Sequence, residues 1–397
     1  MHYAKQTAIR SKQAFALRGR IMTPQGIKSG TVAIEHGIIK DLRAEGFSNM
    51  HTIDMGNAFI VPGFVDLHTH GVHQYLIDNG LNDLQQICRI VPQYGTTSFL
   101  PTVAPKREGE DVAFLQSIAG IESEGANILG FHLEGPFLKI TGSLSAESVA
   151  KADPKRVKAL MDAIQPYKAI FSISPDVDNI TDIIPLMTVD NTPVFMTHTA
   201  ATVEQAQAAI ALGARHATHF YDVFPCPPVT EPGVRPCGIV EAILADEKVS
   251  VDFILDGVHC DPIAAKVAML AKAKGPGTVC LITDSNIGAG LHPGRFTFGD
   301  SGEIEFAYKG SPARKTKDNT LAGSGLTMDQ AVRNAIEFLD IDLYEAVTMA
   351  SLNPAKVIGA DHRKGKIQPG YDADLVIMDE QYQIVQTLIG GEIKYNK

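Results

Sequence analysis

The sequence predicts an α/β fold, a closed (β/α)8 TIM barrel with a small β-sandwich domain formed from both termini. Eight short apolar runs in the middle of the chain alternate with segments whose apolar residues recur at helical spacing. Most of these runs are apolar throughout, which is typical of parallel strands covered on both faces. The two flanks instead alternate with a period of two and are broken by glycine, proline and aspartate. Eight successive β-α units favour a barrel that closes on itself.

The predicted barrel strands follow one another along the chain, each bounded by turn residues. They are residues 59–68, 96–103, 127–134, 169–174, 193–198, 216–221, 249–256 and 279–284. The clearest helices between them are 202–214, with Thr202 as N-cap, 238–247, and 261–275, with Asp261 as N-cap and Pro262 at the first helical position. A β-rich insert over about 295–322 precedes the last barrel helices, 326–339 and 342–358.

The flanks 13–58 and 365–397 each contain too little apolar surface to fold alone. We therefore expect both ends of the chain to meet in one domain. The predicted division is residues 1–58 and 360–397 for the small β-sandwich domain, and 59–359 for the barrel.

Composition excludes several classes of partner. The 397 residues include 35 basic and 45 acidic ones, and the net charge of −10 disfavours nucleic acid and anionic membranes as partners. Five cysteines without a CxxC pair are expected to be free thiols. The N-terminal residues lack the pattern of a secretory signal, and no apolar stretch is long enough to span a membrane, so a cytoplasmic protein is expected.

Titratable side chains occur where six of the eight predicted strands end. His68 and His70 follow the first strand, His132 and Glu134 close the third, His198 ends the fifth and His219 lies in the sixth; Asp256 and His259 follow the seventh and Asp284 ends the eighth. Reactive groups of such barrels lie at the carboxyl ends of the strands. One HxH pair by itself is weak evidence, but the joint placement of these residues indicates one site.

Imidazole and carboxylate ligands suit a divalent metal ion, with zinc expected and iron or manganese also accepted. Residues two apart in a strand point the same way, so His68 and His70 can bind one ion together with Asp284. His198 and His219 come from neighbouring strands and can hold a second ion. Glu134 is placed to bridge the two, and the sequence thus predicts a site for one or two ions per chain.

These segments resemble the ordered motifs of the amidohydrolase superfamily, most closely its N-acetylglucosamine-6-phosphate deacetylases. The motifs are "PGFVDLHTHG", "FHLEGPFL", "THTAAT", "HATHFYD", "DGVHCD" and "LITDSN", with "GKIQPGYDADLVI" in the C-terminal flank. The resemblance implies removal of the N-acetyl group from a small-molecule amino sugar, with Asp284 as general acid/base and His259 polarising the carbonyl. It also implies a homodimer in which the "EPG" loop reaches the neighbouring site.

The resemblance is incomplete on the side of the substrate. The family's histidine after HLEGP is replaced by Leu144, an asparagine that meets the substrate phosphate by Asp222, and the phosphate-binding arginine before "EPG" by Thr230. Arg235 and Ser143 are further candidates for contacts with the substrate. Either this loop bends differently and still binds phosphate, or the substrate is a non-phosphorylated or modified N-acyl amino sugar.

Other functions carried by the same barrel fit this sequence less well. Cyclic amidases bridge their metals with a carbamylated lysine at the end of strand four, but the only lysine near that strand, Lys168, lies at its entrance. A glutamate bridge also disfavours the one-metal deaminases. A non-catalytic scaffold would be free to lose ligands, whereas every ligand position is filled here.

Overall fold

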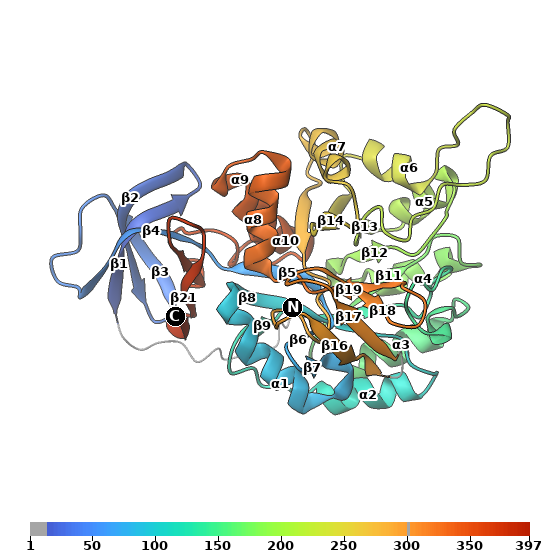
Figure 1. Cartoon of the computed structure of the whole chain (residues 1–397), viewed down its shortest axis with the longest axis horizontal. Helices are drawn as coiled ribbons and strands as arrows, with labels where there is room; N and C mark the ends of the chain where they lie inside the picture. The colour runs from blue at the N-terminus through green and yellow to red at the C-terminus, as the bar shows by residue number, and fades with distance from the viewer. Residues whose placement is uncertain (1–13, 300–301) are drawn as a thin grey trace.

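The computed structural model describes residues 14–299 and 302–397. A parallel barrel forms the larger part of the molecule, and a separate sheet built from both ends of the chain lies beside it (Figure 1). The expected fold class is confirmed.

The barrel contains eight parallel strands in the order of the sequence. They are β5 (Phe64–Thr69), β8 (Thr96–Val103), β10 (Phe131–Glu134), β11 (Ala169–Ile173), β12 (Val194–Met196), β13 (Ala214–Ala217), β14 (Ser250–Ile254) and β15 (Val279–Ile282), with the short β9 (Asn127–Ile128) paired to β8. The first and last strands meet through a parallel bridge between Thr69 and Ser285 and a hydrogen bond from Asp284 N to His68 O of 2.9 Å. These contacts close the barrel and bring the ends of β5 and β15 together.

The expected strand over 59–68 is in fact two strands, and this part of the prediction was wrong. β4 (Thr52–Pro62) belongs to the terminal sheet as far as Pro62, and the barrel strand begins only at Phe64. Gly63 separates them because a Cβ there would lie 2.2 Å from Thr97 Oγ1. The chain passes too close to β8 at this point for any larger residue.

The helices surround the barrel. They are α1 (Leu81–Ile90), α2 (Glu110–Ile118), α3 (Pro154–Ala163), α4 (Ile180–Met187), α5 (Val203–Ala211), α6 (Ile239–Ala245), α7 (Pro262–Lys272), α8 (Met328–Leu339), α9 (Leu343–Ala350) and α10 (Leu352–Val357). The predicted N-caps are confirmed, since Thr202 Oγ1 accepts from Gln205 N and Asp261 Oδ1 accepts from Ile263 N. The expected helix over 342–358 is two helices, α9 and α10, that meet at Ser351.

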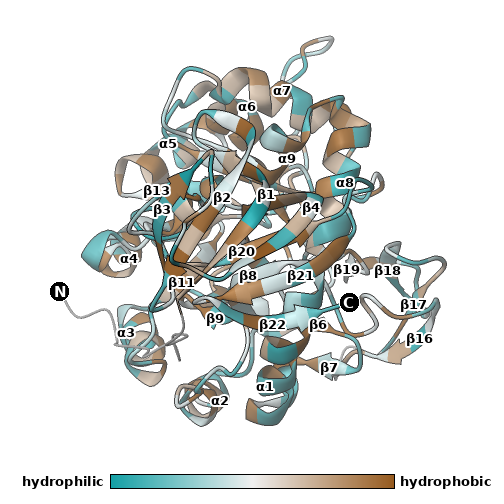
Figure 2. Ribbon diagram, turned by 90° about the vertical axis from the view of Figure 1, so that its left-hand side faces the viewer, coloured by the Kyte–Doolittle hydropathy of each residue, from teal (hydrophilic) through white to brown (hydrophobic). Residues whose placement is uncertain are grey.

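The terminal sheet has seven strands in the order β22-β21-β20-β4-β1-β2-β3. Besides β4 these are β1 (Phe15–Thr23), β2 (Gly26–Glu35), β3 (Ile38–Arg43), β20 (Leu375–Met378), β21 (Ile384–Ile389) and β22 (Glu392–Asn396). Ile39 N in β3 donates to Tyr371 O ahead of β20 at 2.8 Å, so the sheet curls back on itself around its own apolar core. Figure 2 views the molecule from the side of this sheet.

The expected β-rich insert is confirmed as a four-stranded antiparallel sheet. Its strands are β16 (Gly294–Thr297), β17 (Glu303–Phe306), β18 (Pro312–Lys315) and β19 (Leu321–Ser324). A bridge from Ser285 to Ser324 ties β19 to the point where the barrel closes. The insert packs through Ile304 and Phe306 against Leu76 of β7 (Tyr75–Leu76), which pairs with β6 (Gly71–Val72), and it therefore borders the carboxyl end of the barrel.

Among the described residues, no helix has the length and apolarity that crossing a membrane requires.

Candidate metal centre and active site

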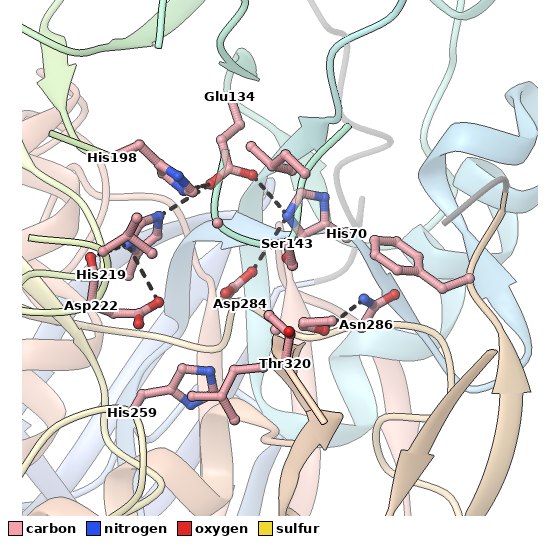
Figure 3. A pocket seen from close by; sticks show the side chains of 17 residues that line it. His70, Glu134, Ser143, His198, His219, Asp222, His259, Asp284, Asn286 and Thr320 are labelled. Atoms are coloured by element: carbon pink, nitrogen blue, oxygen red, sulfur yellow. Dashed lines mark hydrogen bonds and ion pairs between the residues drawn. The ribbon is translucent and has the colours of Figure 1, made fainter. Parts of the chain in front are cut away.

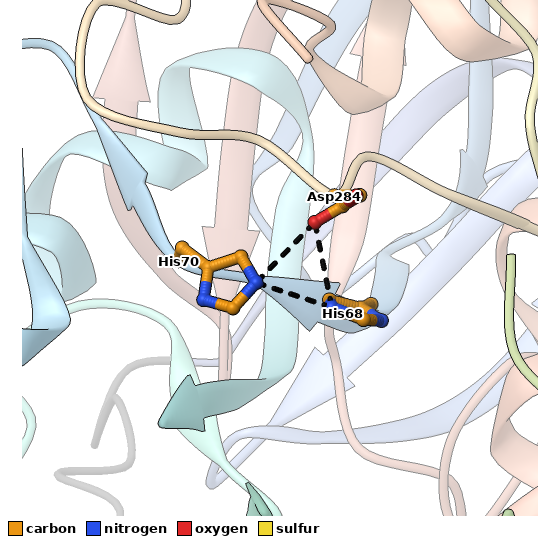
Figure 4. Close-up of side chains that lie close together, drawn as sticks. All are labelled: His68, His70 and Asp284. Carbon is orange, nitrogen blue, oxygen red and sulfur yellow. Dashed lines mark hydrogen bonds and ion pairs between the residues drawn. The ribbon is translucent and has the colours of Figure 1, made fainter. Parts of the chain in front are cut away.

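All six expected metal ligands converge at the carboxyl end of the barrel, and all are buried; Figure 3 shows five of them and Figure 4 shows His68. His68 lies in β5 with His70 just beyond it, and Glu134 is the last residue of β10. His198, His219 and Asp284 each lie two residues past the end of their strands, β12, β13 and β15. The expectation that His219 lies within a strand was therefore wrong, because β13 ends at Ala217.

These last three residues share an uncommon backbone conformation. Their φ values are positive, 51° for His198, 36° for His219 and 44° for Asp284. Residues other than glycine adopt this region rarely, and such strain concentrates at functional sites because the surrounding structure must enforce it. At Asp284 the enforcement is visible: Ser324 N donates to Asp284 O at 2.8 Å, and a Cβ on Gly323 would lie 2.7 Å from that oxygen. The turn redirects each side chain from the strand end toward the centre of the barrel mouth.

His68, His70 and Asp284 form a nearly equilateral triangle of potential ligand atoms (Figure 4). The two Nε2 atoms are 3.3 Å apart, and each lies 3.4 Å from Asp284 Oδ1. Ligand atoms about 2.0–2.1 Å from a tetrahedral zinc ion are separated by about 3.3–3.4 Å. Among the described residues, Asp284 Oδ1 and His70 Nδ1 have no hydrogen-bond partner although they are buried. The donor set and its dimensions fit a divalent cation.

Glu134 directs its two oxygens toward two different pairs of histidines. Oε2 lies 3.6 Å from His68 Nε2 and 3.2 Å from His70 Nε2. Oε1 lies 3.4 Å from His198 Nε2 and 3.1 Å from His219 Nε2. A carboxylate divided in this way can bridge two ions, which is the role that the sequence predicted for it. His68, Glu134 and His219 also form a second group close enough to hold a metal.

Polar partners behind the histidines fix their orientation. His68 Nδ1 lies 3.1 Å from Thr218 Oγ1, which donates in turn to Asp252 Oδ2. His198 Nδ1 donates to Ile140 O at 2.9 Å, which leaves the lone pair of Nε2 facing Glu134. Metal-binding histidines are commonly held by such hydrogen bonds from the second ring nitrogen. Thr218 lies within the motif "HATHFYD" and Asp252 in the next strand, but neither was expected to support the site, because their contact with His68 depends on how the strands are aligned.

His132 is not placed to bind the ions. Its ring nitrogens contact Thr102 Oγ1 at 3.1 Å and Ser172 Oγ at 2.5 Å, and its ring packs edge-on against His68 at 4.5 Å. Complete burial holds its pKa well below the ordinary value, so the ring is neutral. It supports His68 from beneath.

The six candidate ligands include a carboxylate and histidines whose pKa values shift strongly because they lie against one another. Burial alone would raise the pKa of Glu134, but the charge of His68 and hydrogen bonds from His198 and His219 hold it well below its ordinary value. Burial opposes the charging of His70 and His219 as well, yet Glu134 raises the pKa of His70 to about 9 and that of His219 to about 10. A buried carboxylate thus stays ionised and attracts positive charge, and a metal cation can replace the protons.

His259 lies across the cavity from Glu134 and is paired with Asp256. Asp256 Oδ2 accepts from His259 Nδ1 at 2.7 Å, and Asp256 Oδ1 accepts from the backbone N of His259 at 3.0 Å. Burial alone would lower the pKa of His259, but the hydrogen bond and charge of Asp256 outweigh it and raise the pKa above the ordinary value. The carboxylate therefore fixes the ring and favours a protonated imidazole that can donate from Nε2.

A cavity of about 250 Å³ opens above these residues. Ser143 and Asp222 line it, as expected, and so does Leu144. The insert forms the opposite wall, which sequence reasoning did not foresee; it and the neighbouring loop contribute Asn286, Phe298, Thr320, Leu321, Ala322 and Gly323. The one available signal was the position of the insert, directly after the strand that ends in Asp284.

Arg235, a candidate for contact with the substrate, does not line this cavity in its own protomer. Its side chain is exposed, and its NH1 lies 2.6 Å from Glu241 Oε1 in α6. Arg235 belongs to the segment between β13 and α6, which extends away from the barrel at the upper right of Figure 1. The ion pair with Glu241 keeps the guanidinium on the outside of the protomer.

Comparisons with known proteins agree with the fold and the site. A model of the amidohydrolase family matches residues 59–394. N-acetylglucosamine-6-phosphate deacetylase of Bacillus subtilis (strain 168) is 31% identical over 381 residues, which cover 93% of each chain. The resemblance seen in the motifs is thereby confirmed.

Two solved structures show the same likeness in three dimensions. The N-acetylglucosamine-6-phosphate deacetylase from Pasteurella multocida has a TM-score of 0.85 at 25% identity, covering 96% of this chain and 100% of that one. A mutant deacetylase from Mycobacterium smegmatis, solved in complex with N-acetyl-D-glucosamine-6-phosphate, gives the same TM-score and identity, with 97% and 100% coverage.

Proposed function

Because the chain belongs to the amidohydrolase family, we propose that it is a metal-dependent deacetylase that removes the N-acetyl group from an amino sugar. Its relatives from Bacillus subtilis and Pasteurella multocida are named for N-acetylglucosamine-6-phosphate. The proposed substrate is that sugar or a close relative of it, and the products are acetate and the free amine.

The observation that supports the proposal most is the division of Glu134 between two histidine pairs. Oε2 faces His68 and His70, and Oε1 faces His198 and His219. Together with Asp284, these residues would hold one or two divalent ions, with zinc as the expected ion. When bound, such an ion supplies Lewis acidity, which makes water more acidic and polarises a carbonyl.

In the proposed reaction, Asp284 is the general acid/base. Its buried Oδ1 has no hydrogen-bond partner among the described residues and can accept the proton of water as water attacks the acetamide carbon. The same proton then passes to the sugar nitrogen as the carbon–nitrogen bond breaks. Without it the nitrogen would have to leave as an unstable amide anion.

His259 stabilises the negative charge that develops on the acetyl oxygen. Asp256 holds its ring at 2.7 Å through Nδ1, so Nε2 is free to donate a hydrogen bond into the cavity. A donor fixed in advance stabilises the transition state without a cost of reorganisation at the moment of reaction.

The test is direct. Protein freed of metal and then reloaded with zinc is incubated with N-acetylglucosamine-6-phosphate and with N-acetylglucosamine, and the release of acetate and of free amine is measured. Equal amounts of both products, dependent on metal, are expected. Absence of both products from both sugars, in protein that binds metal, would refute the deacetylase.

We also propose a homodimer in a reducing compartment such as the cytoplasm. The projecting segment between β13 and α6 exposes Val229 and Val234, whose exposed fractions are 66% and 57%. These two side chains would lose exposed apolar surface if the loop packed against a second protomer. All five cysteines are free thiols. Sedimentation velocity would test the dimer.

A further inference from the structure

The cavity over the metal centre is lined by carboxylate and imidazole side chains. Its lining contains three carboxylates, Glu134, Asp222 and Asp284, and no lysine or arginine among the described residues. Glu134 and Asp284 face the histidines and would be neutralised by bound ions. Asp222 is left over, with its side chain 27% exposed, and Figure 3 shows it beside His219 on the side of the cavity that holds His259.

Three basic side chains of the insert and of the projecting segment are engaged elsewhere. Lys315 Nζ donates to the backbone oxygen of Ser143 at 2.6 Å, and Arg314 NH1 donates to Asn319 O at 3.0 Å. Both lie in a separate cavity of about 350 Å³ between the insert and Val258. Arg235 pairs with Glu241 outside the barrel mouth of its own protomer. A phosphate dianion is normally bound by arginine or lysine donors, and none of these lines the cavity that holds the metal ligands.

The polar groups that do line the cavity suit hydroxyl groups. The side chain of Asp222 has one ionic neighbour in the described structure, His219 Nδ1 at 4.0 Å, and its oxygens remain available to accept hydrogen bonds. Ser143 and Thr320 add hydroxyl groups to the lining of the same cavity. A carboxylate accepts hydrogen bonds from sugar hydroxyls, while facing a phosphate it would be repulsive.

We propose that the substrate is an unphosphorylated N-acetylated amino sugar, and that Asp222 selects it by accepting hydrogen bonds from hydroxyl groups and repelling phosphate. This inference rests on the proposed deacetylase function and specifies its substrate class. It separates this chain from the relatives whose names include a 6-phosphate.

The experiment compares kcat/KM of the zinc-loaded protein for N-acetylglucosamine and N-acetylglucosamine-6-phosphate, in the wild type and in Asp222→Asn. The amide keeps the size of the side chain and removes its charge. We expect the wild type to prefer the unphosphorylated sugar by about tenfold or more, and Asp222→Asn to reduce that preference by about tenfold, mainly through faster turnover of the phosphorylated sugar. The matched control, Asp178→Asn, removes an exposed carboxylate outside the cavity and should leave the preference unchanged.

The possible outcomes distinguish a failure of this inference from a failure of the proposed deacetylase function. A wild-type preference for the phosphorylated sugar would overturn the inference and leave the deacetylase function in place. If Lys315→Ala then lost that preference, the phosphate would bind in the neighbouring cavity. A preference for the unphosphorylated sugar that Asp222→Asn does not alter would overturn the role of Asp222. Hydrolysis of neither sugar would overturn both proposals. If Asp222→Asn does not fold, as judged by its melting temperature, the wild-type comparison decides alone.

Discussion

Replacing Asp284 by asparagine removes one negative charge and one proton acceptor with almost no change in shape. In the structure, Asp284 Oδ1 lies 3.4 Å from both His68 Nε2 and His70 Nε2 and has no hydrogen-bond partner among the described residues. The amide oxygen can occupy the same position as a weaker, neutral ligand. Glu134, His198 and His219 are untouched, so we expect the variant to keep at least one ion per chain.

The size of the effect follows from the role assigned to the side chain. A positioned general acid/base contributes about 10²–10⁴ in rate, or about 3–5 kcal/mol of transition-state stabilisation. Asp284→Asn should therefore lower kcat by about 10²–10⁴ with a much smaller change in KM, since no contact with the sugar is removed. The assay is acetate release at saturating substrate, with metal content per chain measured on the same sample.

The control for Asp284→Asn is Asp178→Asn, which makes the same chemical change at an exposed position. It should retain the wild-type rate and metal content. If Asp284→Asn kept its metal and turned over within about threefold of the wild type, a proton-transfer role of the usual size would be excluded and the assignment refuted.

Three further predictions concern the pairing of His259, the metal and the terminal sheet. Asp256→Asn removes the carboxylate that raises the pKa of His259. The alkaline limb of the profile of kcat/KM against pH should therefore move to lower pH, while the zinc content stays the same. If that limb does not move, His259 is not the group that titrates there. Zinc at about 100 times its dissociation constant should stabilise the metal-free protein by about 2.7 kcal/mol, seen as a higher melting temperature, and Glu134→Gln should abolish most of this increment. Asp372, 2.7 Å from Arg363 Nε and 3.1 Å from Lys364 Nζ, has a pKa that burial alone would raise but that these cations hold below its ordinary value. The contribution of Asp372 to the free energy of unfolding is present above the unfolded pKa of about 3.9 and is lost as pH falls through the lower folded pKa. Asp372→Asn should therefore lower the free energy of unfolding by about 2 kcal/mol at pH 7 and by progressively less below about pH 4. A loss of stability that does not depend on pH would contradict the ion pair as its cause.

Much of the site could be predicted because some of its signals are local. His68 and His70 stand two residues apart in a strand, and this spacing alone makes them face the same way. The apolar runs and the turn residues that bound them likewise depend on the nearest neighbours in sequence, and they located all eight barrel strands to within a few residues. The main error in the strands, the run over 59–68, arose at Gly63, where the apolar pattern continues although the chain passes from one sheet to another.

The contacts that complete the site join residues far apart in the sequence. The wall built by the insert depends on the bridge between Ser285 and Ser324. Arg235 was a candidate for substrate contact because it follows Thr230, the residue that replaces the family's phosphate-binding arginine, by five positions. Nothing in the local sequence shows that Glu241 holds the guanidinium outside. Such pairings depend on which surfaces meet once the barrel has closed.

The sequence by itself determined the barrel, the identity of the six candidate ligands and the family to which they point, because side-chain periodicity and residue chemistry are properties of short segments. Only the tertiary structure decided that Glu134 divides its oxygens between two histidine pairs, that positive φ angles aim His198, His219 and Asp284 inward, and that no described lysine or arginine lines the cavity. The physical reason is distance along the chain. Thr69 and Ser285, whose hydroxyl oxygens lie 2.6 Å apart, are separated by 216 positions, and only the closed barrel brings such residues into contact.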